Sequence, residues 1–286
     1  MKGKRQGRRV RFNSHAKNVA APILLMLLIL AAWEAAVRVF EIDTYILPPP
    51  SEIIVAIYRE RALIFGHLQV TLFEIAAGYA LACAVGFVLS VAIVYSKAFR
   101  RGVLPLIVAS QTIPVIAIAP ILVIWFGYND LPRIIITALV AFFPLTVSFV
   151  TGLDSLEPEL INFFRSLNAN GLQIFLKLRI PAALPNIFAG LKVATTLAVI
   201  GATISEWVGA NAGLGYLMAQ DTQQINTTRV FAALVVLGTF GIVFFAFVSL
   251  LQRLFMPWVY GAPRVPWRRS VAVPATAVNP LDTGTG

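Results

Sequence analysis

The amino-acid sequence predicts an all-α protein that crosses a membrane several times. Three observations support this fold class: 58% of the 286 residues are hydrophobic, only 13% are charged, and the mean hydropathy is +0.81. A soluble domain has about a quarter of its residues charged. The formal net charge of +10 would suggest nucleic acid as a partner of a soluble protein. In so apolar a chain we expect membrane lipids as surroundings and no nucleic acid.

The distribution of charge predicts six membrane spans. A helix needs ~20 mostly apolar residues to cross the hydrocarbon core, and four uncharged runs reach that length, at residues 75–96, 102–129, 134–153 and 230–252. Two further runs carry charges near their ends, Glu34 and Arg38 in one and Lys192 and Glu206 in the other. We therefore expect a membrane domain of residues 19–258, with spans at 19–40, 70–96, 103–126, 133–153, 186–207 and 230–252.

The two ends of the chain are expected to be tails. Seven Lys and Arg and no acid fall in the first 17 residues, which predicts a basic cytoplasmic tail at 1–18. A basic start before an apolar run is also typical of a cleaved secretory signal. Here the run continues through Trp33 to Phe40, longer than a usual signal core, which favours an uncleaved helix. Residues 259–286 are expected to form a flexible cytoplasmic tail.

The cations also predict the orientation. With the N-terminus inside, 18 of the 23 Lys and Arg fall on the inner side and five on the outer side. Short cytoplasmic loops hold the excess of Lys and Arg. Both termini are therefore expected in the cytoplasm.

Small residues recur every four positions in two of the predicted spans. They permit close approach of helix backbones where lipid provides no hydrophobic drive for association. Packing within one chain and mating with a partner subunit both remain open as explanations. The two sets are Gly78, Ala82, Gly86 and Ser90, and Gly190, Ala194, Ala198 and Ala202.

Prolines interrupt the third span. Pro114 and Pro120 each remove a backbone hydrogen bond, so we expect this helix to be bent or locally unwound. Broken backbone at membrane depth is tolerated where it lines a cavity, although ordinary helix packing is a close alternative. The residues that we expect along a translocation pathway are Gln111, Thr112, Pro114, Trp125 and Glu206.

The segment between the fourth and fifth spans is predicted to be a structured cytoplasmic element, at residues 155–180. Asp154 or Ser155 can cap a short helix that runs to about Leu167. Asn and Gly at 168–171 predict a turn. A further helical turn at 172–178 follows, with prolines at 181 and 185 before the fifth span. Its apolar side chains, which suggest docking on another protein, are Phe163, Phe164, Leu167 and Phe175.

The chain resembles a known family over residues 47–258. It is similar to the permease subunits of type I ATP-binding-cassette importers, in the group for nitrate, sulfonates, taurine and pyrimidine precursors. The order and spacing of six segments carry the resemblance: Ile-Leu-Pro-Pro-Pro-Ser-Glu at 46–52, Ile-Leu-Val-Ile-Trp-Phe-Gly at 121–127, Phe-Phe-Pro at 142–144, Arg-Ser-Leu-Asn-Ala at 165–169, Ile-Pro-Ala-Ala-Leu-Pro at 180–185 and Gly-Leu-Gly-Tyr at 213–216.

The family's cytoplasmic loop has a Glu-Ala-Ala signature followed by Gly, and this chain departs from it at both places. Asn162 stands at the acidic position and Asn168 at the glycine. Asn is the usual substitute for Gly at positive backbone angles, so the turn should survive. The resemblance implies a coupling helix that contacts the ATPase subunit through Arg165, Ser166, Leu167, Asn168, Ala169, Gly171, Leu172 and Gln173.

The resemblance also implies the assembly. The expected partners are ABC ATPase subunits, which would use ATP and Mg, a second permease protomer in a homodimer or a pair with a paralogue, and an extracytoplasmic solute-binding protein. The chain itself would bind no cofactor or metal, have no catalytic residues, and reside in the bacterial plasma (inner) membrane. We expect a small polar solute as cargo, with a thiamine-precursor pyrimidine or related heterocycle favoured over a sulfonate, taurine or nitrate.

Two other classes of membrane protein would need different residues. An ion-coupled secondary transporter or channel would need ionisable residues at the bilayer centre. Glu34, Glu74, Lys192 and Glu206 are each expected near a helix end, where their polar ends can reach the interface. An integral membrane enzyme would need a convergent catalytic set, which His15 and His67 do not supply. The sequence has no GxxxxGK[ST] loop for ATP.

Overall fold

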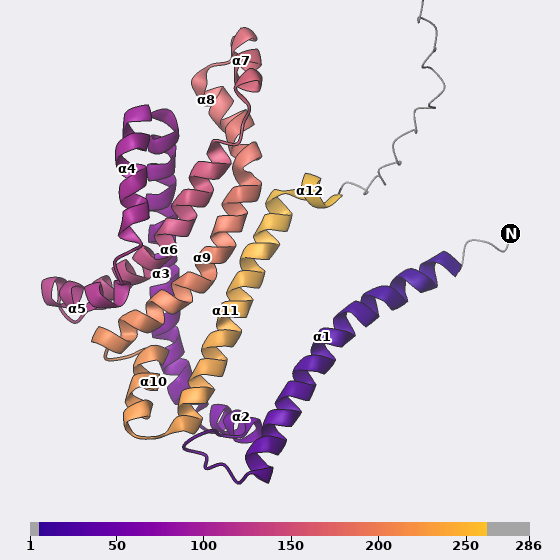
Figure 1. Cartoon of the computed structure of the whole chain (residues 1–286), viewed down its shortest axis with the longest axis vertical. Coiled ribbons are helices and arrows are strands. Elements are labelled where there is room, and N and C mark those ends of the chain that lie inside the picture. The colour runs from indigo at the N-terminus through magenta and orange to yellow at the C-terminus, as the bar shows by residue number, and fades with distance from the viewer. Residues whose placement is uncertain (1–5, 262–286) are drawn as a thin grey trace, which may run out of the picture.

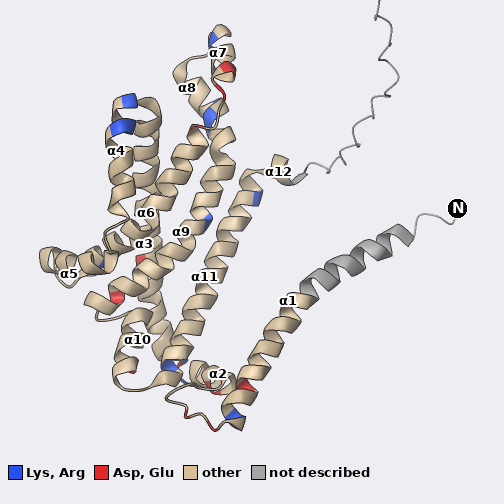
Figure 2. Cartoon of the chain, in the orientation of Figure 1, with Lys and Arg blue, Asp and Glu red and all other residues tan. Residues whose placement is uncertain are grey.

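The computed structural model describes residues 6–261 of the chain, with side chains from Ala21 to Val259, and the regular secondary structure in that range is helical. Most of the predicted C-terminal tail and the first five residues of the basic tail lie outside it. Figure 1 shows long helices that run roughly along one axis, with short helices at both ends. Figure 2 shows Lys, Arg, Asp and Glu mainly toward those ends.

Within the described residues, five helices are long and apolar enough to cross a membrane, and the number of spans is six if one bent pair counts as a single span. The long elements are α1 (Gln6–Val39), α3 (Arg61–Tyr95), α6 (Asp130–Leu153), α9 (Ile180–Gly209) and α11 (Thr227–Phe255). The bent pair is α4 (Lys97–Ser110) and α5 (Val115–Phe126), which meet at 98°. The six spans expected from the sequence correspond to these elements.

The helix boundaries differ from the predicted spans where polar residues lie inside helices. α3 begins at Arg61, nine residues before the predicted start of the second span. The fifth span was expected to begin at residue 186, but helical structure runs without a gap from α8 (Gly171–Ile174) through a π-helical turn η1 (Phe175–Arg179) into α9. Pro181 follows the π-helical turn directly and Pro185 lies inside α9, so each removes a backbone N–H group from a continuing helix without ending it.

The core of the bundle is formed by α3, α6 and α9. Its buried residues are mostly small or aliphatic, including Ile75, Ala138, Leu145 and Ala198. A Cβ added at Gly78 would lie 2.5 Å from Cβ of Thr137 on α6, and one added at Gly86 would lie 3.0 Å from Oγ1 of Thr146. Close approach of this kind needs residues without bulk.

Both sets of small residues are therefore used inside the chain. Every member of the two sets is buried, and Gly190 faces Ser148 of α6 as Gly78 faces Thr137. The structure thus decides in favour of packing within one chain. The small residues are not available as a mating surface for a partner.

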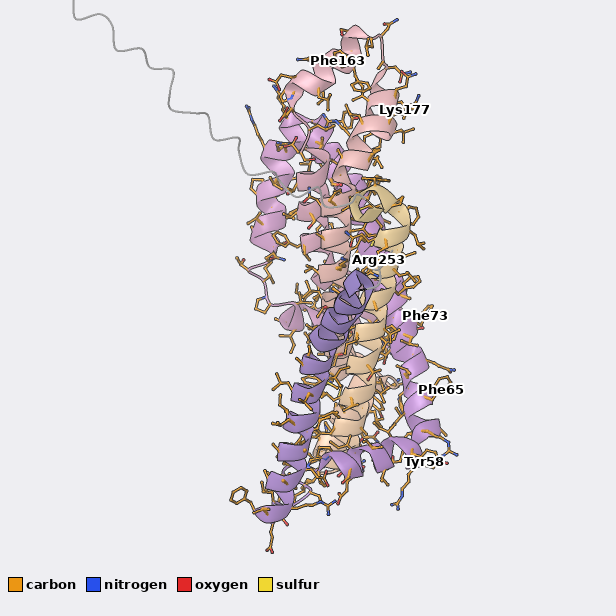
Figure 3. All side chains as sticks on the ribbon, turned by 90° about the vertical axis from the view of Figure 1, so that its right-hand side faces the viewer. Tyr58, Phe65, Phe73, Phe163, Lys177 and Arg253 are labelled. Carbon is orange, nitrogen blue, oxygen red and sulfur yellow. The ribbon has the colours of Figure 1, made fainter. Side chains whose placement is uncertain are left out.

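The residues of α1 with described side chains meet the rest of the bundle near its C-terminal end. Figure 1 shows α1 leaning away from α11 except where it meets α2 (Pro50–Arg59). There Glu34 accepts hydrogen bonds from the backbone N–H of Ser51 at 3.0 Å and from its hydroxyl at 2.8 Å, and pairs with Arg38 at 2.7 Å. The α1 carboxylate thereby satisfies a free N–H group at the start of α2. Figure 3 shows Tyr58 on α2 at the opposite end of the molecule from Phe163 and Lys177.

Candidate functional site

The α7–α8 turn is the first candidate site. α7 (Pro158–Ser166) leads into a tight reversal in which Asn168 adopts φ +62°. The N–H of Asn168 donates to the carbonyl of Arg165 at 2.9 Å, and that of Ala169 to the carbonyl of Phe164 at 3.1 Å. These bonds satisfy carbonyls at the end of α7. Asn168 thus takes the left-handed conformation expected from its place in the turn.

A capping box fixes the other side of the turn. The Asn170 side chain accepts from the N–H of Gln173 at 2.8 Å, and the Gln173 side chain accepts from the N–H of Asn170 at 3.0 Å. This reciprocal pair satisfies two otherwise free N–H groups at a helix start. The reversal is therefore defined by hydrogen bonds within this chain.

One local expectation for this segment was wrong. Neither Asp154 nor Ser155 caps α7: the helix begins at Pro158 after Glu157, whereas Asp154 ends α6 and pairs with Arg100 at 3.0 Å. Gly171 does not have a positive φ, and a Cβ there would meet nothing within 4 Å. The strained position is Asn168 alone.

The turn presents apolar side chains to the outside. Phe163, Leu167 and Leu172 are 58%, 63% and 66% exposed. Of the eight residues expected to contact an ATPase subunit, seven are exposed and Ala169 is half-buried between α7 and α8. Below them, Arg179 donates to the carbonyl of Leu153 at 2.9 Å and stacks 5.4 Å from the Tyr95 ring. The exposed turn is thus attached firmly to α3 and α6.

The break between α4 and α5 is the second candidate site. Gln111 ends α4, Pro114 precedes α5, and both are exposed. An apolar hollow of about 580 Å³ lies beside the break, between α4, α5, α6 and Leu197 of α9, and Ser110 and Gln111 supply its polar groups. Of the residues expected along a pathway, only Gln111 lines this hollow. Thr112 lies in the break, and Trp125 is 71% exposed at the far end of α5.

Glu206 does not belong to that surface. It is 1% exposed, and its carboxylate accepts from the N–H of Gly215 at 2.5 Å and from the hydroxyl of Thr71 at 2.6 Å. Thr71 in turn accepts from the N–H of Leu214 at 2.8 Å, and His67 accepts from the N–H of Gly213 at 3.0 Å. Glu206 and α3 therefore hold the loop that begins α10 (Leu214–Gln223).

A buried ion pair lies next to this loop. Glu74 of α3 is completely buried, and its Oε1 lies 2.7 Å from Nη1 of Arg133, which is 7% exposed. Nη2 of Arg133 also contacts the exposed Asp130 at 2.5 Å. The expectation that Glu74 and Glu206 reach the interface is wrong, because both side chains are enclosed by protein. α3 extends 13 residues before Glu74, so this carboxylate is far from its helix end.

Sequence reasoning missed this cluster because each charge was judged alone. Two signals pointed to it: opposite charges on neighbouring spans, at Glu74 and Arg133, and a Gly-Leu-Gly sequence seven residues after Glu206. A carboxylate near such glycines can accept from their backbone amides. Within residues 21–259, no three His, Cys, Asp or Glu side chains come together in a way that could hold a metal ion.

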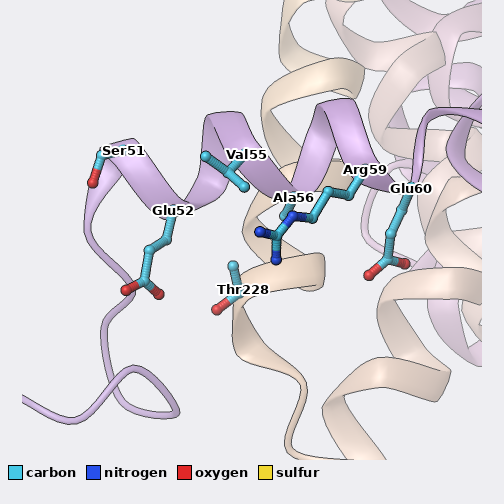
Figure 4. A pocket seen from close by; sticks show the side chains of 7 residues that line it. All are labelled: Ser51, Glu52, Val55, Ala56, Arg59, Glu60 and Thr228. Atoms are coloured by element: carbon cyan, nitrogen blue, oxygen red, sulfur yellow. The ribbon is translucent and has the colours of Figure 1, made fainter.

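A polar groove of about 400 Å³ occupies the end of the molecule opposite the α7–α8 turn. It lies between α2 and the start of α11. In Figure 4 the side chain of Arg59 extends over Thr228, with Glu52 and Glu60 on either side. Glu60 also pairs with Arg229 at 2.9 Å. The groove therefore exposes both signs of charge.

The comparisons with known proteins decide between the classes. Residues 75–259 match the family described as binding-protein-dependent transport system inner membrane component. The chain belongs to this family. It is therefore the permease subunit of an ABC importer, a multi-pass protein of the inner membrane. The α7–α8 turn and the break between α4 and α5 are thus parts of this permease.

Two relatives and one solved structure extend the comparison. The permease is 40% identical over 238 residues to the formylaminopyrimidine transport permease ThiX of Halalkalibacterium halodurans, covering 83% of this chain and 95% of that protein. It is 29% identical to the putative aliphatic sulfonates transport permease SsuC of Bacillus subtilis, covering 82% of this chain and 86% of that protein. The fold resembles a chain of the MetNI methionine ABC transporter in an inward-facing conformation, with a TM-score of 0.61 at 20% sequence identity. The match covers 69% of this chain and 98% of that chain.

Proposed function

We propose that this permease imports a pyrimidine of the thiamine-precursor type, delivered by an extracytoplasmic binding protein. The observation that carries the proposal is the 40% identity to a formylaminopyrimidine permease across almost the whole of that protein. The identity to a sulfonate permease of similar coverage is 29%. A sulfonate, taurine or nitrate is the competing cargo.

The α7–α8 turn is proposed as the contact with the ATPase subunit. Three exposed apolar side chains on a turn with its own hydrogen bonds make a preformed surface, and little conformational entropy is lost when such a surface binds. The attachment through Arg179 to α6 would transmit a displacement of the turn to the core helices. ATP hydrolysis is assigned to the partner, so the permease contributes movement and no catalytic group.

The pathway is proposed to lie at the face that carries the hollow beside α4 and α5. An apolar hollow with a few polar groups suits a heterocycle that is bound weakly in transit. A second permease copy facing this hollow would close it. The small residues of α3 and α9 lend no support to this pairing, since α6 occupies them.

In this arrangement the polar groove between α2 and α11 faces outward and receives the binding protein. Its exposed acids and Arg59 offer complementary partners to charges on a docking surface, which favours orientation and rate of encounter. The α7–α8 end faces the cytoplasm, as do both termini.

The decisive experiment reconstitutes the permease in liposomes with its ATPase subunits and binding protein. Uptake of labelled formylaminopyrimidine is expected to require ATP inside and to persist when ion gradients are collapsed. Uptake driven by an ion gradient without ATP would instead indicate a secondary transporter. Isothermal titration of the binding protein with the pyrimidine, taurine and an alkanesulfonate separates an incorrect cargo from an incorrect mechanism.

A further inference from the structure

Lys192 lies between α9 and α11, away from both ends of α9. Its side chain is half-buried, and Nζ lies 5.9 Å from the centre of the Phe245 ring on α11. None of the ion pairs among the side chains of residues 21–259 includes Lys192. An ammonium group in apolar surroundings is costly unless an anion or water reaches it. The described part of the chain does not provide that anion.

An apolar groove begins beside this lysine. It has a volume of about 320 Å³, and Phe245 belongs both to its wall and to the lysine contact. A Cβ added at Gly238 would meet nothing within 4 Å, and one added at Gly241 would meet only Val199, at 3.8 Å. The backbone of α11 is therefore open to the groove. The other lining residues are Thr196, Ile200, Leu237 and Ile242.

The position of the lysine suits a headgroup above the groove. Arg253 lies in the last turn of α11. Phe245 lies eight residues before it, which is about 12 Å along the helix. Side chains lean toward the N-terminus of their helix, so Lys192 leans toward Ile180, the end at which Phe188 of α9 meets Phe255 of α11. Lysine also extends its charged end toward the membrane surface. The groove continues in the opposite direction, deeper into the bundle.

A second copy of α1 is the competing occupant, because Ile23–Leu30 is exposed and apolar. The charge of α1 does not complement Lys192. The one acid in α1 is Glu34, which is already bound to Arg38 and Ser51 at the other end of that helix. Another α1 would fill the groove but leave Lys192 without an anion.

We propose that Lys192 and the α9–α11 groove bind an anionic phospholipid. The lipid phosphate pairs with the ammonium group, and an acyl chain lies along Gly238 and Gly241. Basic pockets between membrane helices recognise anionic headgroups in this way. The proposal is independent of the cargo, since the groove is lined by residues other than those of the hollow beside α4 and α5.

Native mass spectrometry of the complete transporter, purified with its ATPase subunits, tests the proposal. Phosphatidylglycerol and phosphatidylcholine with the same acyl chains are titrated separately. We expect Lys192→Gln to weaken phosphatidylglycerol binding about fivefold and to leave phosphatidylcholine unchanged, whereas Lys192→Arg retains the preference. The matched control is Lys177→Gln, an exposed lysine in η1, which should not change either lipid.

A second variant tests the groove without removing the charge. Gly241→Leu is expected to lower phosphatidylglycerol binding, and this comparison remains decisive if Lys192→Gln fails to assemble. Equal phosphatidylglycerol affinity in wild type and Gly241→Leu, or in wild type and Lys192→Gln, would overturn the proposal. Displacement of the lipid by inorganic phosphate alone would show a free-anion site instead. Disulfide cross-linking of Leu27→Cys to Gly241→Cys between two copies, in a Cys83→Ala background, would show that α1 of the partner occupies the groove.

Discussion

Glu206 holds the start of α10 through backbone amides and a hydroxyl. Gly213, with φ +117°, brings the chain so close that an added Cβ would overlap the Glu206 carboxylate. Non-glycine residues are disfavoured at such angles. The glycine therefore serves both the backbone conformation and the approach of the acid.

Gly213→Ala is predicted to destabilise the permease by about 1–3 kcal/mol through backbone strain, with a further loss from the displaced Glu206. Gly102→Ala is the matched control, because it lies in α4 with open space around the added methyl, and it should be neutral or stabilising. Thermal unfolding of the purified transporter compares the two. Equal melting temperatures for both variants would contradict the role given to Gly213.

Arg133→Met is predicted to cost about 3–5 kcal/mol, because it leaves the Glu74 carboxylate buried without its partner. Replacing both residues, as Arg133→Met with Glu74→Met, should recover most of that loss. Thermal unfolding of the single and double variants measures the difference. A double variant no more stable than Arg133→Met would show that the ion pair is not the source of the effect.

The sequence was sufficient to predict the backbone conformation of Asn168. It was insufficient to predict the surroundings of Glu74 and Glu206. A local turn depends on neighbouring residues, so Asn in place of Gly predicted a positive φ. The surroundings of Glu74 depend on Arg133 and Glu206, which lie far along the chain. Hydropathy placed Glu74 near a span end, because α3 extends through polar residues that hydropathy excludes. Glu206 does lie near the end of α9, but hydropathy does not show that the loop before α10 encloses it.

At the scale of elements, the α7–α8 turn combines a rigid backbone with an apolar surface. Its conformation follows from Asn168 and from the Asn170–Gln173 capping box. Asn168→Val is predicted to cost about 1–2 kcal/mol, because a β-branched residue is poorly tolerated at φ +62°. Asn168→Gly, which permits the same φ, should be tolerated. Co-purification of ATPase subunits should fall for the first variant and remain for the second.

Ala169→Asp is predicted to abolish ATPase co-purification and uptake. The residue is half-buried beside the exposed turn, and an unpaired charge buried in a protein contact costs several kcal/mol. Membrane abundance should be unchanged, since no membrane helix contains the substitution. Normal uptake by this variant would show that another segment couples the permease to ATP hydrolysis.

The break in the third span was predictable, but the continuous helix that leads into the fifth span was not. Pro114 and Pro120 indicated a bend near Gln111, and the structure has one of 98°. In contrast, Pro181 and Pro185 suggested a boundary before the fifth span, yet η1 carries the helix through it. Proline removes one backbone hydrogen bond from a helix interior without always ending the helix, and the sequence did not show that the π-helical turn η1 would precede Pro181.

At the scale of the whole molecule, α2 and α10 lie at one end of the bundle and the α7–α8 turn at the other (Figure 1). The excess of cations at the α7–α8 side predicts that this end is cytoplasmic. In a Cys83→Ala background, Tyr58→Cys should react with an impermeant maleimide in intact cells. Arg101→Cys should react only after the cells are permeabilised. The reverse pattern would invert the topology.

The buried pair of Glu74 and Arg133 sets a condition on how the protein is made. The acid is synthesised 59 residues before the arginine and 132 residues before Glu206. At 5–20 residues per second, a ribosome needs about 3–12 s to reach the arginine. During that interval α3 carries an acid with no partner, which the lipid interior disfavours. Release of α3 into the bilayer should therefore wait until α6 leaves the ribosome, so that insertion of the two helices is coupled in time.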